Sequence, residues 1–226
     1  MICRPQPRHK PSNHSECVVS GKLRAGNPHP TPTHPIEIRL SDAGYPHRVA
    51  RQLGNNAPKQ ISVLGNLDLL ALPKTALFCS SRCPGKVILA TYDQAAKWRD
   101  TGRCVISGFH SPVEKECLQI LLRGTQPIII CPARSLPRRV PPEWQQPLAA
   151  GRLLVLSPFT ARENRVTADL ATRRNEFVAA LADEVFIVHT TAGGHLDSLS
   201  HRLRVWGIPL IKPSPFSHAN ASKHSN

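Results

Sequence analysis

The stretch that decides the fold is Cys104-Val105-Ile106-Ser107-Gly108-Phe109-His110-Ser111-Pro112-Val113-Glu114. It begins with the apolar residues of a short buried strand and continues through a Ser-Gly turn. Val113, Cys117, Ile120 and Leu121 then recur at helical spacing, which predicts an amphipathic helix. A strand that turns tightly into a helix leaves backbone N–H groups without partners, and these can bind a phosphate or another anion.

The alternation of strand and helix continues through the middle of the chain. We expect strands at Ala76–Ser80, Cys104–Ser107, Pro127–Cys131, Leu153–Leu156, Glu184–His189 and Ile208–Lys212. We expect helices at 86–101, 112–123, within 162–182, and at 195–206. Apolar strands that alternate with amphipathic helices indicate an α/β fold with a parallel sheet covered on both faces. Ligands of such folds bind beyond the carboxyl ends of the strands, where the strand order reverses.

The two ends of the chain differ from this middle part. Residues 1–40 are rich in Pro, His and Ser and carry six Lys or Arg against two Glu. Because proline at this density prevents regular helices and sheet ladders, we expect a disordered basic arm, which either helps to hold a polyanion or is a featureless tail. The predicted organisation is this arm, an α/β domain at 41–212 and a loose tail at 213–226.

The charge of the chain indicates the class of partner. The 226 residues include 29 Lys and Arg against 15 Asp and Glu, a formal net charge of +14. Such an excess is typical of proteins that bind nucleic acid, although it also serves general solubility. With 5% aromatic residues, we expect contact with the phosphate backbone rather than base stacking. No apolar stretch is long enough to span a bilayer and the start lacks a signal-peptide core, so we expect a cytoplasmic protein without membrane partners.

The sequence predicts no cofactor, no metal site and no catalytic residue. Its seven cysteines form no CxxC pair, and several lie in apolar runs, as free thiols do in a reducing cytosol. It contains no HExxH or Walker A motif and no Ser/His/Asp order. His110, Glu114 and His195 can converge as acid–base groups, but spacing alone does not indicate hydrolysis. We therefore expect a binding protein rather than an enzyme.

Three predicted turns place small and hydroxyl residues at the carboxyl ends of strands. Each turn precedes a helix, so their N–H groups can point into one crevice. We therefore expect an anion site that contains Ser81, Arg82, Ser107, Gly108, His110, Gly193, Gly194 and His195.

Arginines concentrate in the second half of the chain. Between residues 132 and 175 there are eight Arg, no Lys and three acids, and a guanidinium binds phosphate with two parallel donors. Arg134, Arg138 and Arg139 predict a basic loop that either extends a phosphate-binding track or is a solvated surface.

The pair Arg173-Arg174 lies within the predicted helix of the 162–182 segment. In one unbroken helix over 166–182, Arg173 would lie on the apolar face, where an unpaired guanidinium is costly. We expect a break near Thr172 that brings Arg173, Arg174 and Asn175 to the anion site. The alternative is that Arg173 extends its charged end to solvent or pairs with Glu176 or Asp169.

At these motifs the chain resembles the DprA/Smf family of DNA-processing and recombination-mediator proteins, which have an extended Rossmann-like domain. The resemblance runs from about Ser41 to Lys212 and rests on five motifs in order. They are Asp42-Ala43-Gly44-Tyr45-Pro46, Ser80-Ser81-Arg82, Ser107-Gly108, Arg174-Asn175 and Gly193-Gly194-His195-Leu196. The resemblance implies that the chain binds single-stranded DNA, hands it to a RecA-type recombinase and forms a homodimer.

The chain departs from the family pattern at two motifs. Ser111, Pro112 and Glu114 stand where the family has Arg, Gly and Asp, and His195 replaces a serine. We also expect no winged-helix domain after the core. Two other interpretations stay open. One is a nucleotide sensor or enzyme like the lysine-decarboxylase-like phosphoribohydrolases, whose glycine turn is followed by a glutamate that this chain lacks. The other is a diverged scaffold with an empty site.

Overall fold

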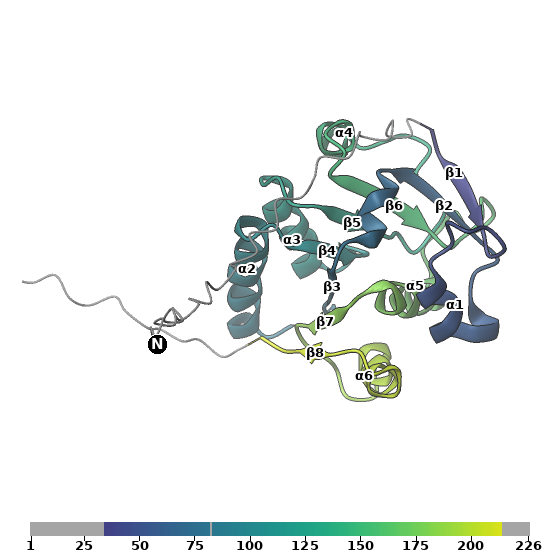
Figure 1. The fold of residues 1–226 in the computed structure, drawn as a ribbon. Coiled ribbons are helices and arrows are strands. Elements are labelled where there is room, and N and C mark those ends of the chain that lie inside the picture. The colour runs from purple at the N-terminus through teal and green to yellow at the C-terminus, as the bar shows by residue number, and fades with distance from the viewer. Residues whose placement is uncertain (1–33, 82, 214–226) are drawn as a thin grey trace, which may run out of the picture.

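The computed structural model describes residues 34–81 and 83–213, in which eight strands form one sheet (Figure 1). The strands are β1 (Ile36–Arg39), β2 (Gln60–Gly65), β3 (Lys74–Phe78), β4 (Cys104–Ser107), β5 (Ile128–Ile130), β6 (Leu153–Ser157), β7 (Glu184–Ile187) and β8 (Leu210–Ile211). The α-helices are α1 (His47–Leu53), α2 (Gly85–Asp100), α3 (Pro112–Leu122), α4 (Pro142–Ala149), α5 (Ala168–Leu181) and α6 (His195–Trp206). The short 3-10 helices are η1 (Gly54–Asn56) and η2 (Leu67–Ala71).

The order of the strands is β1-β2-β6-β5-β4-β3-β7-β8. Strands β3, β4, β5, β7 and β8 run parallel to their neighbours and β6 runs parallel to β5, whereas β2 pairs antiparallel with both β1 and β6. From β3 the chain adds β4, β5 and β6 on one side, and α5 then returns it to β7 on the other side of β3. The strand order therefore reverses between β3 and β7, which places the expected ligand crevice at their carboxyl ends. The predicted α/β class is confirmed.

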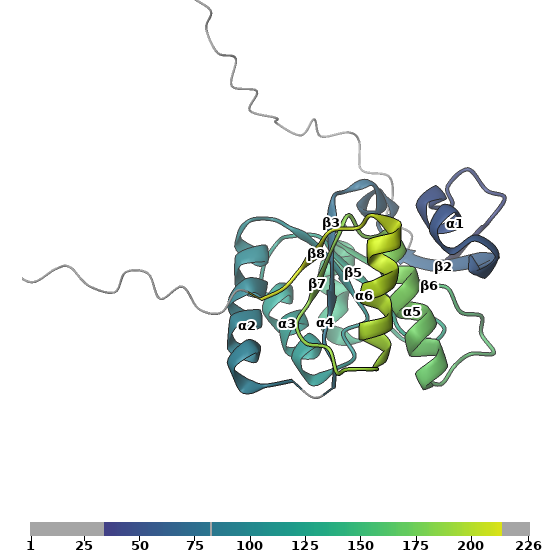
Figure 2. The ribbon, with the colours of Figure 1, turned by 90° about the horizontal axis from the view of Figure 1, so that it is seen from below.

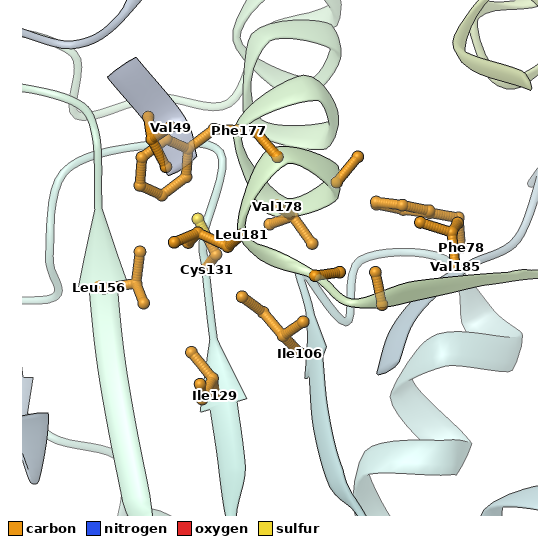
Figure 3. Packing of buried hydrophobic residues seen from close by; sticks show 14 of the residues in the cluster. Val49, Phe78, Ile106, Ile129, Cys131, Leu156, Phe177, Val178, Leu181 and Val185 are labelled. Atoms are coloured by element: carbon orange, nitrogen blue, oxygen red, sulfur yellow. The ribbon is translucent and has the colours of Figure 1, made fainter. Parts of the chain in front are cut away.

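Helices cover both faces of the sheet (Figure 2). Helices α2, α3 and α4 pack on one face, and α1, α5 and α6 pack on the other. Strand alternation divides the core in the same way, since Val105 faces the first group and Ile106 faces the second. Figure 3 shows the second face, where side chains of α5 lie over those of the strands. This packing fixes α5 against the sheet, and with it the arginines that α5 carries.

The amino-terminal boundary of the domain differs from the prediction. Residues 36–39, which we assigned to the arm, form β1 and pair with β2 in the register Ile36↔Val63. Only Ile38 of this strand is buried, so the sequence offers no apolar run that would identify it. Residues 1–33 and 214–226 lie outside the described residues, so the remaining predictions for the arm and the tail stay predictions.

The break that we expected in α5 is wrong. The helix begins after Thr167, whose Oγ1 accepts the N–H of Leu170 at 3.2 Å, and it continues without interruption to Leu181. The Thr172 hydroxyl donates to the Ala168 carbonyl at 3.0 Å, a bond inside the helix rather than a cap. The buried arginine is Arg174, at 4% exposure, whereas the side chain of Arg173 is 54% exposed. No helix within the described residues is long and apolar enough to cross a bilayer.

Candidate nucleic-acid interface

The carboxylate of Glu114 joins the turns that follow β3 and β4. Its Oε1 accepts the N–H of Cys79 at 2.8 Å, and its Oε2 accepts the N–H groups of His110 at 2.8 Å and Ser111 at 3.2 Å. Ser111 in turn accepts the N–H of Glu114 at 3.3 Å, which completes a capping box at the start of α3. The N–H groups that we expected to bind an external anion thus bind a carboxylate of the chain itself. The Glu114 carboxylate therefore takes the position at which we expected an external anion.

Ser107 shapes the turn after β4 and does not reach a ligand. Its fully buried hydroxyl donates to the Leu77 carbonyl at 2.8 Å and accepts the N–H of Phe109 at 3.1 Å. Phe109 is held at φ 47°, in the left-handed region that non-glycine residues seldom occupy. Such strain persists only where the surroundings enforce it, and it is common at binding and active sites.

The turn after β6 repeats the arrangement. The hydroxyl of Ser157 donates to the Arg134 carbonyl at 2.7 Å and accepts the N–H of Phe159 at 3.1 Å. A serine at a strand end therefore fixes the following turn at two places on the carboxyl edge of the sheet.

Arg174 reaches from α5 to the turn after β4. Its NH1 donates to the Cys131 carbonyl at 3.1 Å and its Nε donates to the Asn175 Oδ1 at 2.8 Å. A Cβ built on Gly108 would overlap the guanidinium, so only glycine permits this approach. In the part of the chain that the structure describes, no carboxylate forms an ion pair with Arg174. A buried cation without a counterion is costly, and it creates a place where an anion would be stabilised.

Helix α6, which begins directly after the glycine turn that follows β7, packs against α5 near Asn175. His195, the first residue of α6, and Asn175 line the same small hollow of about 40 Å³. Gly194 caps α6, and Gly193, at φ 71°, donates its N–H to the Asp197 Oδ2 at 3.2 Å. An acidic residue of the following helix thus binds an N–H of this turn too, as Glu114 does in the turn after β4.

Arg173 faces solvent and is neutralised within the protein. Its NH1 lies 3.3 Å from Glu163 Oε1 and 3.8 Å from Asp169 Oδ2, and its guanidinium lies 5.4 Å from the ring centroid of Phe159. Of the two predicted partners, Glu176 and Asp169, the structure contains the pair with Asp169. The charge of Arg173 is therefore less available to a ligand than that of Arg174.

A groove of about 540 Å³ lies between the β5–α4 loop and the β6–α5 loop. The three arginines of the predicted basic loop, Arg134, Arg138 and Arg139, line one side and are exposed. Arg165 and Asn164 line the other side. Among the described residues, none of these four arginines forms an ion pair. The groove begins at the carboxyl ends of β5 and β6, and Arg174 binds the first carbonyl after β5. The groove and the Arg174 site therefore adjoin. We call this combined surface the basic edge, and it consists of Gly108, Arg174 and the four groove arginines.

Sequence reasoning missed Arg165, although the density of arginine between residues 132 and 175 contained the signal. Ser81 and His110 are exposed beside the basic edge. The turn after β3 is hydrogen-bonded to the segment after β7, because the Ser80 N–H donates to the His189 carbonyl at 3.2 Å. Arg82 lies outside the described residues, so its predicted contribution stays a prediction.

The buried cysteines Cys104, Cys117 and Cys131 are structural in character. Burial raises the pKa of the Cys104 thiol to about 11 and the pKa values of the Cys117 and Cys131 thiols to about 12. These thiols therefore stay protonated and pack as small apolar groups. Within residues 34–81 and 83–213, no cluster of three His, Cys, Asp or Glu side chains is arranged to hold a metal ion.

A sequence profile of the family described as DNA recombination-mediator protein A matches residues 37–204. The chain belongs to this family. The match runs from β1 into α6, and it includes the basic edge. A comparison with curated protein sequences finds no match.

Solved structures of DNA processing protein A share the fold of this family member. The protein from Helicobacter pylori, whose single-stranded DNA binding mode is known, is 20% identical with a TM-score of 0.62, over 79% of this chain and 80% of that one. The protein from Streptococcus pneumoniae is 19% identical with a TM-score of 0.55, over 78% and 70% of the two chains.

Proposed function

We propose that this member of the DNA recombination-mediator protein A family binds single-stranded DNA along the basic edge, in DNA processing and recombination. The observation that carries the proposal is the buried guanidinium of Arg174, which has no carboxylate partner among the described residues and lies against Gly108 at the carboxyl edge. A backbone phosphate would supply the missing negative charge and accept charge-assisted hydrogen bonds. The family assignment and the DNA-binding relative from H. pylori support the same role.

From Arg174 the proposed path of the strand continues into the groove. Arg134, Arg138, Arg139 and Arg165 offer four guanidinium groups without ion-pair partners among the described residues, each able to bind phosphate through two donors. Contacts to phosphate carry affinity without reading sequence, so we expect little base preference. On the other side, Asn175, Gly193, Gly194 and His195 would contact the continuing strand, together with Ser81, Arg82 and His110.

We propose a binding role rather than catalysis. Glu114, the carboxylate among the predicted acid–base candidates, is buried and accepts three backbone N–H groups. Both of its oxygens are therefore held by N–H donors of the fold, so the group is not presented to a substrate. The family assignment does not favour the phosphoribohydrolase alternative. Transfer of DNA to a RecA-type recombinase, a homodimeric state and a cytoplasmic location are further proposals that rest on the family resemblance.

The test is the affinity for a labelled oligonucleotide as a function of salt concentration. For single strands, log K falls with log salt by about 0.7 for each phosphate neutralised. Arg174→Met should weaken binding about tenfold or more, since a hydrogen bond to a charged group contributes about 1.5–3 kcal/mol. Arg99→Gln is the matched control, because Arg99 already pairs with Asp100 at the end of α2. Unchanged affinity and salt slope in Arg174→Met would overturn the proposal.

A further inference from the structure

A second cavity lies at the opposite, amino edge of the sheet. It has a volume of about 300 Å³ and lies between the start of α1, the end of α5 and the segment from η2 to β3. Leu70, Leu72 and Leu181 give it apolar walls, and its charged groups are Arg48, Lys74 and Asp183. The size and the combination of apolar wall with few polar groups are typical of a site for a small molecule.

Asp183 makes shorter contacts with its other partners than with the ammonium group of Lys74. Its Oδ1 accepts from Arg48 NH1 at 2.7 Å, and its Oδ2 accepts from the backbone N–H of Lys74 at 2.8 Å. The Lys74 Nζ lies 3.8 Å from the same Oδ2, which is longer than a hydrogen bond. The cavity therefore contains two cationic side chains and one carboxylate. The short contacts of that carboxylate do not include the Lys74 ammonium.

Among the described residues, one buried donor of the cavity, the Arg48 Nε, lacks an acceptor, and the buried Lys74 ammonium beside it has only a long ion pair to Asp183. Lys74 is only 4% exposed. The neighbouring carboxylate of Glu184 does not help, because it binds Thr75 and Arg103, and Thr75 faces away from Lys74 across the strand. Burial accordingly lowers the pKa of Lys74 despite Asp183 nearby. Leaving a buried donor unpaired costs stability, so a group that accepts from the Arg48 Nε and also contacts the Lys74 ammonium would be stabilised.

We propose that this cavity binds a small oxyanion, such as inorganic phosphate or a short carboxylate. One oxygen would accept from the Arg48 Nε and the Lys74 Nζ, and the negative charge would balance the second cation. The leucine walls would limit access of water, which strengthens the electrostatic attraction. The site lies at the amino ends of β3 and β7, whereas the basic edge lies beyond the carboxyl ends, so it can be occupied independently of DNA.

The test is calorimetric titration of the full chain with inorganic phosphate and, separately, with succinate, at constant ionic strength. Lys74→Met and Arg48→Met each remove one donor while keeping most of the side-chain volume. Arg174→Met serves as a control for phosphate that binds at the basic edge. A failure of the cavity proposal can therefore be distinguished from a failure of the DNA-binding proposal. A thermal unfolding transition verifies that each variant is folded. If Lys74→Met does not fold, Arg48→Met provides the test, because Arg48 is partly exposed.

We expect saturable binding of at least one anion by the unaltered chain and by Arg174→Met, weakened at least tenfold in the cavity variants. Phosphate binding alone, succinate binding alone or both would each support the site and would identify the preferred oxyanion. Absence of saturable binding by the unaltered chain, or equal binding in the folded cavity variants, would overturn the proposal.

Discussion

The guanidinium of Arg174 occupies the space that a side chain on Gly108 would fill. The two residues come from α5 and from the turn after β4, 66 positions apart in the chain. Their contact makes the glycine a condition for the arginine's position. The lack of a side chain at Gly108 and the buried position of the Arg174 guanidinium therefore depend on each other. A substitution at Gly108 tests the role of Arg174.

Replacing Gly108 by alanine should weaken single-stranded DNA binding without removing any charge. The added methyl group would displace the guanidinium from its place beside Cys131, so we expect a loss of about tenfold, similar to removal of one charge-assisted hydrogen bond. Gly44→Ala is the matched control, because a Cβ there meets only Ile38 Cγ2 at 4.0 Å. Fluorescence anisotropy with a labelled oligonucleotide measures the difference. Equal affinities of the two alanine variants would contradict the assigned role of Arg174.

Glu114→Gln should destabilise the protein. An amide offers a single acceptor oxygen and presents N–H donors to a site lined by three N–H groups, those of Cys79, His110 and Ser111. Buried donors without partners cost about 1–3 kcal/mol each, so we expect the free energy of unfolding to fall by about 2 kcal/mol. Urea unfolding measures it, with the exposed Glu116→Gln as control. A difference between the two variants below about 0.5 kcal/mol, the usual scale of a surface substitution, would contradict the internal-anion role.

The sequence predicts the parallel part of the fold because its strands are apolar throughout. Strands β4, β5 and β6 are buried along their whole length, and such runs between amphipathic helices are typical of a parallel sheet covered on both faces. Strand β1 cannot be predicted in this way, because it is an edge strand with one buried residue. Its place in the sheet depends on pairing with β2, which is a long-range contact that no local pattern encodes.

The candidate site is predictable in position but not in detail. Residues at the carboxyl ends of parallel strands must meet at one edge, so the sequence places Gly108 and His195 there. It does not give the direction of hydrogen bonds, and Glu114 is therefore predicted as an acid–base candidate rather than as the internal anion. The sequence predicts a break in α5 because an unbroken helix counted from residue 166 puts Arg173, rather than Arg174, on the apolar face. Val166 precedes the cap at Thr167, and neighbouring positions differ by about 100° around a helix.

Arg165→Gln should weaken DNA binding more than Arg162→Gln does. Both arginines are exposed in the β6–α5 loop, but only Arg165 lines the groove of the basic edge. We expect Arg165→Gln to lower the magnitude of the log–log salt slope by about 0.7, the value for one lost phosphate contact. Arg162→Gln should leave the slope nearly unchanged. The same slope in both variants would show that the groove is a solvated surface rather than part of the binding path.

The Asp183 network should make stability fall in acid. Burial opposes ionisation of Asp183, but the Lys74 N–H, the Lys74 ammonium and the Arg48 guanidinium together hold the pKa of this carboxyl below its usual 3.8. The pKa of Lys74 is also lowered, because Lys74 is the more deeply buried partner and loses more hydration than Asp183 restores. A carboxyl with a depressed pKa stabilises the folded state above its unfolded pKa, and this contribution disappears as the pH falls through the folded value.

The difference in unfolding free energy between the unaltered chain and Asp183→Asn should therefore be largest near neutral pH and should shrink below about pH 4. Urea unfolding at a series of pH values measures it, and Asp100→Asn, which alters an exposed ion pair, serves as control. Since Asp183 is also partly exposed, raised salt should reduce its contribution. A difference that stays constant from neutral pH to about pH 3 would mean that Asp183 acts through its shape and hydrogen bonds and not through its charge.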